Sequence, residues 1–161
     1  MANIRKIDIV LNKFLVEQGL SDSLCACYDA NSDSYYQYDS VLSRVVLGGL
    51  TNKKADEIYM DYCKELGLEV DVDVMTMSFL HEVGHHNTID FLDGEEIFES
   101  EMIKLLLAAN NEETKEYFMK YFECPEEYEA TWDAVSFCNA YPEVVLQLDE
   151  DIQNALYGKE M

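Results

Sequence analysis

The run His81-Glu82-Val83-Gly84-His85 constrains this chain more than any other feature of its sequence. Residues four apart lie on one face of an α-helix, so His81 and His85 can direct both imidazole rings at a single metal ion. Glu82 follows the first histidine directly, where its carboxylate can accept a proton from a water molecule beside that ion. The pattern therefore predicts a helix that carries a metal site, with His81 and His85 as ligands and Glu82 as the catalytic base.

The chain is long enough to form one domain with a buried core. It has 161 residues, of which 48% are hydrophobic, and this composition excludes general disorder. No stretch approaches the roughly 18 apolar residues of a membrane span. The N-terminal segment carries Asp8 within its apolar part and lacks the cleavage site of a signal peptide, and the five cysteines show no disulfide framework. We therefore expect a single domain over residues 1–161, located in the cytoplasm and not bound to a membrane.

The formal net charge of −22 is the second unusual feature. An acidic surface repels phosphate groups and anionic lipids, which disfavours direct binding to nucleic acid or to a membrane surface. Three interpretations of the charge remain open at this point. It can serve solubility, it can favour a basic peptide or protein substrate, or it can mimic DNA and occupy a DNA-binding partner.

Apolar periodicity and helix-breaking residues predict a helix, then a small sheet, then more helices. This order favours an α+β fold with a small antiparallel or mixed sheet, an active-site helix and a helical C-terminal half. Asp71 or Asp73 is the expected cap of the motif helix. The expected elements are helix 3–18, a hairpin of strands 24–29 and 34–38 around residues 31–33, strand 41–47, helix 51–66, the motif helix to residue 86, and helices 95–109, 112–122, 126–140 and 142–157.

A catalytic zinc site needs a third protein ligand, which the motif does not supply. The chain has no histidine after His86, and His86 points about 100° away from the preceding histidine around the helix. The third ligand is then a carboxylate or a thiolate. Because metal-bound histidines give their second ring N–H to an acceptor that is often a carboxylate, a helix with Glu and Asp four apart could supply both groups. Glu129 and Asp133 form such a pair, and Glu126 and Glu127 are the competing ligands.

The motif H-E-x-x-H followed by E-A-x-x-D resembles the gluzincin metallopeptidases. The small size of the chain and its H-E-x-G-H variant are similar to the compact minigluzincins and to the ImmA/IrrE-type proteins of mobile elements. The resemblance implies that His81, His85 and Glu129 bind Zn2+ and that Asp133 orients His81. It also implies that Glu82 acts as general base and then general acid in the hydrolysis of a peptide bond.

The same resemblance implies a zincin-like fold and further roles. The strand 41–47 would be the edge strand that pairs with an extended substrate. Gluzincins place a Tyr, His or Arg side chain near the oxyanion of the transition state, and the unranked candidates here are Tyr128, Tyr141 and Tyr157. Gly84 has no side chain, so a neighbouring element can pack closely against the motif helix.

Three hypotheses about function follow. The chain is a small cytoplasmic zinc peptidase, or a regulatory binding protein that keeps a zincin fold with a structural or inactive zinc site, or an acidic interaction protein of a mobile element. Zinc content separates the third hypothesis from the other two. Hydrolysis by the wild type compared with Glu82→Gln separates the first from the second.

Overall fold

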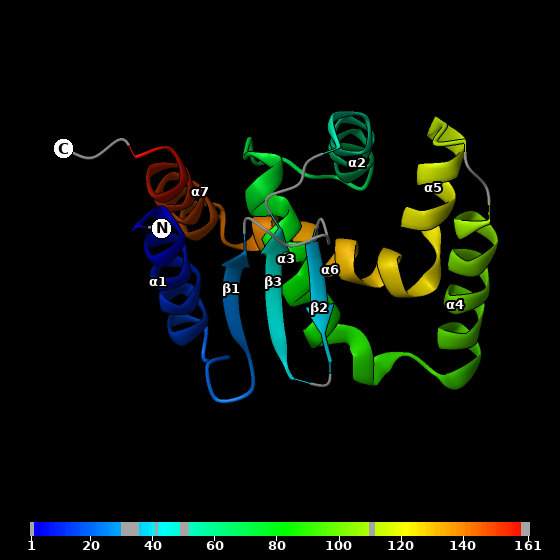
Figure 1. Ribbon diagram of the computed structural model, residues 1–161, viewed down its shortest axis with the longest axis horizontal. Coiled ribbons are helices and arrows are strands. Elements are labelled where there is room, and N and C mark those ends of the chain that lie inside the picture. Colours follow the sequence, from blue (N-terminus) through cyan, green and yellow to red (C-terminus); the bar gives the residue numbers. More distant parts are fainter. Residues whose placement is uncertain (1, 30–35, 41, 49–51, 110–111, 159–161) are drawn as a thin grey trace.

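A small sheet and a larger helical part surround one central helix in the computed structural model, which describes residues 2–29, 36–40, 42–48, 52–109 and 112–158. The elements are α1 (Ala2–Glu17), β1 (Cys25–Asp29), β2 (Tyr36–Asp39), β3 (Arg44–Gly48), α2 (Lys53–Glu65), α3 (Val74–Thr88), the 3-10 helix η1 (Ile89–Phe91), α4 (Gly94–Ala108), α5 (Lys115–Glu123), α6 (Pro125–Ala140) and α7 (Pro142–Tyr157). The predicted α+β class with a small mixed sheet is confirmed. Helices α1 and α7 pack together beside the sheet, and α4 and α5 lie at the opposite end of the molecule (Figure 1). Among the described residues, no helix has the length and apolar character that crossing a bilayer requires.

The sheet corrects two predictions. Its strand order is β1-β3-β2, with β3 parallel to β1 and antiparallel to β2. The predicted hairpin of 24–29 with 34–38 is wrong because β3 lies between the two strands, and its expected turn at 31–33 falls outside the described residues. The predicted edge strand within 41–47 is also wrong, because β3 is central. Val45, Val46 and Leu47 are all buried, as consecutive residues are when both faces of a strand are covered.

Local capping chemistry sets most of the helix ends. Asp73, one of the two predicted caps, precedes α3, and its side chain accepts a hydrogen bond from the Met75 N–H at 3.0 Å. Asn52 caps α2 in the same way through the Ala55 N–H at 3.1 Å. Gly158 ends α7 with a φ of 64°, a conformation that glycine adopts without steric cost. These local signals explain why the predicted helices agree with the observed ones to within a few residues.

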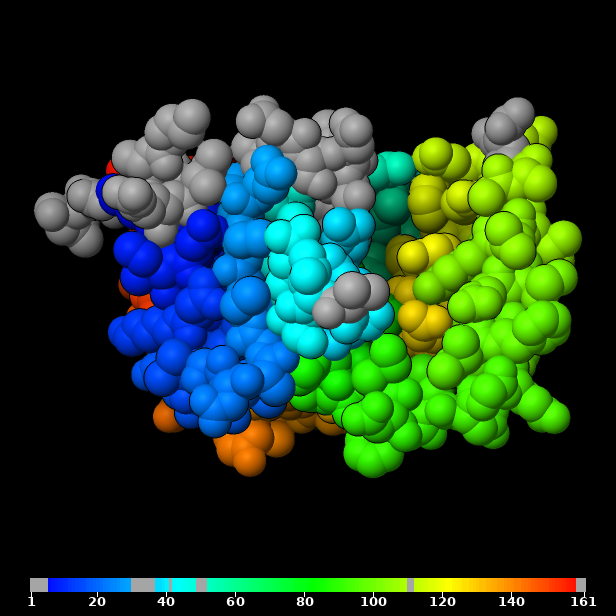
Figure 2. Space-filling view, turned by 60° about the horizontal axis from the view of Figure 1, so that its bottom comes forward, coloured from blue at the N-terminus to red at the C-terminus, as the bar shows by residue number. Residues whose placement is uncertain are grey.

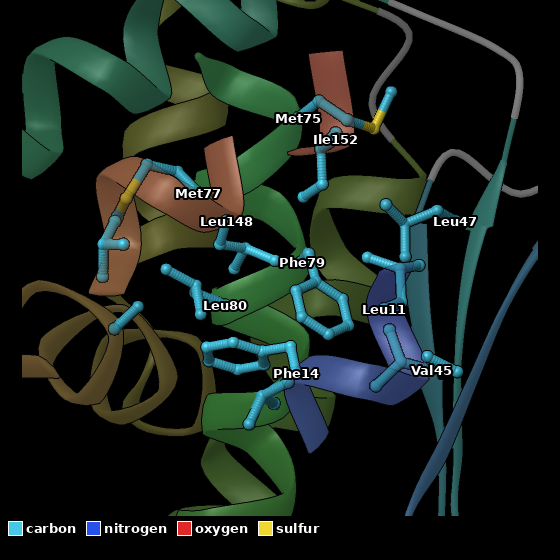
Figure 3. Close-up of a cluster of buried hydrophobic side chains, with 14 of the residues drawn as sticks. Leu11, Phe14, Val45, Leu47, Met75, Met77, Phe79, Leu80, Leu148 and Ile152 are labelled. Atoms are coloured by element: carbon cyan, nitrogen blue, oxygen red, sulfur yellow. The ribbon is translucent and has the colours of Figure 1, made fainter. Parts of the chain in front are cut away.

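Helix α3 lies at the centre of the core and is buried on almost every side. Figure 3 shows Phe79 and Leu80 of this helix among apolar side chains from α1, β3 and α7. Phe79 is fully buried and meets the ring of Phe14 edge to face, with 5.8 Å between the ring centroids. A helix held in this way cannot turn about its axis without disrupting the core. The fold therefore fixes the direction in which the motif side chains point.

Gly84 allows α3 and α6 to approach at backbone distance. A Cβ atom added at Gly84 would lie 2.4 Å from the carbonyl oxygen of Ala130. The expected close packing of a neighbouring element against Gly84 is thereby confirmed, and α6 is that element. The contact also sets the position of Glu127, which lies one turn before Ala130 and faces His81 and His85.

Candidate metal centre

Two imidazole nitrogens and one carboxylate meet between α3 and α6. The Nε2 atoms of His81 and His85 lie 2.8 Å and 3.2 Å from the same oxygen, Oε1 of Glu127. All three side chains are buried, and their ligand atoms lie within 4.8 Å of one another. Two atoms that each bind a tetrahedral zinc ion at 2.0–2.1 Å are about 3.3 Å apart, so this donor set fits such an ion with little movement. The cluster of His81, His85 and Glu127 can therefore hold a metal ion.

The predicted third ligand, Glu129, does not belong to this cluster, and its competitor Glu127 takes the position instead. Successive residues of a helix are about 100° apart, so Glu129 lies about 200° around α6 from Glu127 and faces away from α3. The buried face of α6 explains why Glu127 and not Glu129 joins the cluster. It consists of Glu127, Ala130, Thr131, Ala134, Val135 and Cys138, which follow the spacing of one helix face and do not include Glu129.

Hydroxyl groups, not a carboxylate, contact the second nitrogen of His81. Its Nδ1 lies 2.9 Å from Oγ1 of Thr131 and 3.2 Å from the hydroxyl of Tyr59. When Nε2 binds a metal ion, Nδ1 carries the proton and can donate a hydrogen bond to these oxygens. The predicted partner, Asp133, instead accepts a hydrogen bond from Asn87 at 3.1 Å. Thr131 follows Glu127 by four residues, the same spacing as the predicted pair Glu129 and Asp133.

Lys104 of α4 holds the other oxygen of the ligand carboxylate. Its Nζ donates to Oε2 of Glu127 at 2.7 Å and lies 3.8 Å from Oε1 of Glu126. Burial alone would lower the pKa of Lys104, but the negative charge of Glu127 raises it overall, so the ammonium stays charged. With Oε2 engaged by the lysine, Oε1 remains the oxygen that faces both imidazoles. No sequence pattern pointed to this residue.

Replacing Lys104 with methionine is expected to weaken zinc binding about ten-fold, within the range seen when a metal ligand loses its hydrogen-bond partner. The physical reason is that Glu127 would then be free to rotate and its Oε2 would lack a partner. Competition with a chelator of known affinity measures the change. Lys53→Met is the matched control, because it removes the same charge from an exposed lysine that pairs with Glu57 and not with a ligand. Equal affinity of Lys104→Met and the wild type would show that the lysine does not position the ligand.

The pKa values of the two buried glutamates of the site, Glu82 and Glu127, are shifted in opposite directions. Burial raises the pKa of Glu82, an effect that His81 and His85 only partly offset. Burial also opposes ionisation of Glu127, but the charge of His85 and hydrogen bonds from both imidazoles hold its pKa well below the usual range. Glu127 thus stays ionised, as a metal ligand must, while Glu82 takes up a proton more readily than an exposed glutamate does. This is the division expected between a metal ligand and a proton-transfer group.

A pocket of about 320 Å³ adjoins the candidate metal centre. His81, Glu82 and Glu127 line it together with aromatic side chains of α2 and α5, namely Tyr59, Tyr117, Phe118, Tyr121 and Phe122. Burial beside Asp73 and Glu57 raises the pKa of another lining residue, Asp56, to about 6.

The three tyrosines predicted to stabilise a transition state do not line this pocket. Tyr141 and Tyr157 are more than half exposed at the ends of α6 and α7, and Tyr128 stacks on Trp132 with 6.5 Å between ring centroids. The tyrosines of the described chain that do line it are Tyr59, Tyr117 and Tyr121. The sequence did not single them out, because α2 and α5 are distant from the motif along the chain.

The last histidine of the motif run, His86, is turned away from the cluster. Its Nδ1 lies 2.9 Å from the hydroxyl of Tyr38 and its Nε2 lies 3.2 Å from Oγ of Ser23. The ring of Tyr38 also lies nearly parallel to that of His85, with 6.5 Å between the centroids. Because Tyr38 belongs to β2, these contacts bring an outer strand of the sheet next to the candidate metal centre.

No family model, no curated protein and no solved structure matches the chain. The resemblance to gluzincins accordingly stays a prediction from sequence motifs. What the structure shows is a buried group of His81, His85 and Glu127, provided by two packed helices and able to hold a metal ion.

Proposed function

We propose that this chain is a zinc-dependent peptide-bond hydrolase of the zincin type that acts in the cytoplasm. One observation carries the proposal. The imidazoles of His81 and His85 meet a single carboxylate oxygen of Glu127, while Glu82, from the same helix turn, lines the adjoining pocket. A cluster that only stabilised the fold would have no need of a further buried glutamate at an open pocket.

The chemistry follows from the separate tasks of these residues. A zinc ion held by His81, His85 and Glu127 would supply a Lewis acid that lowers the pKa of water and polarises a carbonyl group. Glu82 accepts the proton of the attacking water and then delivers it to the departing amine. Thr131 accepts a hydrogen bond from the Nδ1–H of His81, which keeps the proton on Nδ1 and leaves Nε2 free for the metal.

The surroundings of the site support an extended peptide as the substrate. Within the described residues, β2 pairs only with β3, and Tyr38 of β2 lies against His85. A peptide added along the outer edge of β2 would therefore run beside the metal centre. The aromatic walls of the pocket and its acidic groups suit an apolar or a basic side chain, and the net charge of −22 favours basic substrates.

The variant Glu82→Gln tests this proposal. It is expected to retain one tightly bound zinc ion and to lose hydrolysis by about 100-fold or more, because the proton-transfer group is removed and the ligands are not. Labelled casein and a library of quenched peptides rich in lysine and arginine are the probes, and elemental analysis measures the zinc. Glu150→Gln, which removes the same charge at an exposed position of α7, is the control.

Two outcomes would contradict the proposal. Undiminished hydrolysis by Glu82→Gln would exclude this residue as the base. Loss of zinc together with activity would show that Glu82 serves to hold the metal and not to transfer a proton.

A further inference from the structure

An exposed apolar face on α4 is not explained by the proposed hydrolase. Phe98, Leu105 and Leu106 expose 64%, 65% and 69% of their surface, and Met102 exposes 41%. At about 100° per residue these side chains fall within one stripe of the helix, opposite the buried Ser100 and Leu107. Large apolar side chains that gather on one exposed face of a helix are typical of an interaction surface. We call Phe98, Met102, Leu105 and Leu106 the α4 stripe.

The exposed charges that α4 itself carries are of one sign. Glu95, Glu99 and Glu101 are exposed on the same helix. The single basic residue of α4, Lys104, points inward and is engaged by Glu127. The exposed charges of α4 are therefore acidic, on a chain whose net charge is −22. A partner that covers the stripe must bring apolar side chains together with positive charges.

The position of α4 leaves this face accessible. The helix lies at the outer end of the molecule, beyond α5 and α6 as seen from the sheet (Figure 1). Figure 2 shows the residues of α4, in yellow-green, forming that end of the surface. The stripe runs over about 12 Å of helix between Phe98 and Leu106, a length that one partner helix can match with ridges packed into grooves.

We infer that the α4 stripe binds an amphipathic helix of another protein, with an apolar face flanked by lysine or arginine. A second copy of this chain is a poorer occupant, because the acidic flanks of the two stripes would oppose each other. A membrane surface is a poorer one too, because its anionic lipids would meet the same carboxylates. This surface lies on the side of α4 opposite Lys104, and the inference holds whether or not the metal centre is catalytic.

The test uses three labelled 18-residue peptides. The first carries leucines at helical spacing with lysine flanks, the second has the same leucines with glutamate flanks, and the third keeps the lysines but has serine in place of leucine. Fluorescence anisotropy measures binding to the full chain, and light scattering measures its oligomeric state. We expect the first peptide to bind at least ten-fold more tightly than the other two.

Two double variants locate the binding surface. Leu105→Ser with Leu106→Ser is expected to weaken binding of the first peptide at least ten-fold without changing the net charge. Ile9→Ser with Val16→Ser removes equally exposed apolar side chains of α1 and is expected to leave binding within two-fold of the wild type. Circular dichroism checks that both variants are folded.

Three results would overturn the inference. If the first and third peptides, which both carry lysines, bind equally well, binding depends on charge alone and not on the α4 stripe. The same conclusion follows if the Leu105→Ser, Leu106→Ser variant binds the first peptide as tightly as the wild type does. If none of the peptides binds the wild type, the stripe does not take a basic helix. If the wild type is a dimer that the α4 variant dissociates, the stripe is a contact between copies of the chain.

Discussion

Glu127→Gln is expected to reduce zinc affinity about 1000-fold, whereas Glu129→Gln leaves it within two-fold of the wild type. The reason is that Oε1 of Glu127 faces both imidazole nitrogens, so its loss removes one of three ligands and the negative charge that balances the metal. The effect should exceed the roughly 10–100-fold seen when only a hydrogen-bond partner of a ligand is lost. Both substitutions remove one negative charge from the same helix, two residues apart, so the pair is matched.

Zinc bound loosely to the acidic surface must be kept out of this measurement. Competition with a chelator reports only the tight site, and elemental analysis after desalting counts the ions that remain bound. If Glu129→Gln loses the tight site and Glu127→Gln keeps it, the assignment of the third ligand is reversed. If neither substitution has an effect, the carboxylate of α6 is not a ligand.

Gly84→Ala is expected to destabilise the chain by about 1–3 kcal/mol, the typical cost of overpacking a well-packed core. Alanine in place of glycine would ordinarily stabilise a helix by about 1 kcal/mol. Here the new methyl group would lie 2.4 Å from the carbonyl oxygen of Ala130, which is backbone and cannot turn aside. Helix α6 must then move away from α3, so Glu127 recedes from the histidines and zinc affinity should fall as well.

Denaturant unfolding measures this change, with Gly94→Ala as the control. A Cβ at Gly94, the first residue of α4, meets no atom within 4 Å, so the control should be neutral or slightly stabilising. If Gly84→Ala were as stable as the wild type and bound zinc equally well, close contact between α3 and α6 would not be what sets the site.

The parts of the site that the sequence predicts are those with local signals. The spacing of His81, Glu82 and His85 and the cap at Asp73 depend on one helix alone, and the structure agrees with all of them. The third ligand depends on which face of α6 meets α3. That face could have been found from the small and apolar residues Ala130, Ala134 and Val135, whose helical period extends back to Glu127.

The strand order shows a second signal that was present in the sequence. Three consecutive apolar residues, Val45, Val46 and Leu47, indicate a strand covered on both faces, which is the pattern of a central strand and not of an edge. The crossover that places β3 between β1 and β2 has no such signal in the sequence. It depends on the parallel pairing of β1 with β3, which passes over β2 in the chain, and no pattern within a single strand encodes that pairing.

The remaining residues of the site could not be identified from sequence. Lys104 reaches Glu127 only because α4 folds back against α6, and the aromatic walls of the pocket come from α2 and α5. A lone lysine on a helix and scattered aromatic residues have no distinctive spacing. Their roles follow from the way the helices pack, which the structure supplies.

Anomalous diffraction at the zinc absorption edge, from crystals grown with zinc, tests the central claim most directly. The account predicts one strong peak within about 2.0–2.2 Å of Nε2 of His81, Nε2 of His85 and an oxygen of Glu127, with a fourth position open toward the pocket. Peaks only at surface carboxylates, or a zinc ion bound to the histidines without Glu127, would contradict it.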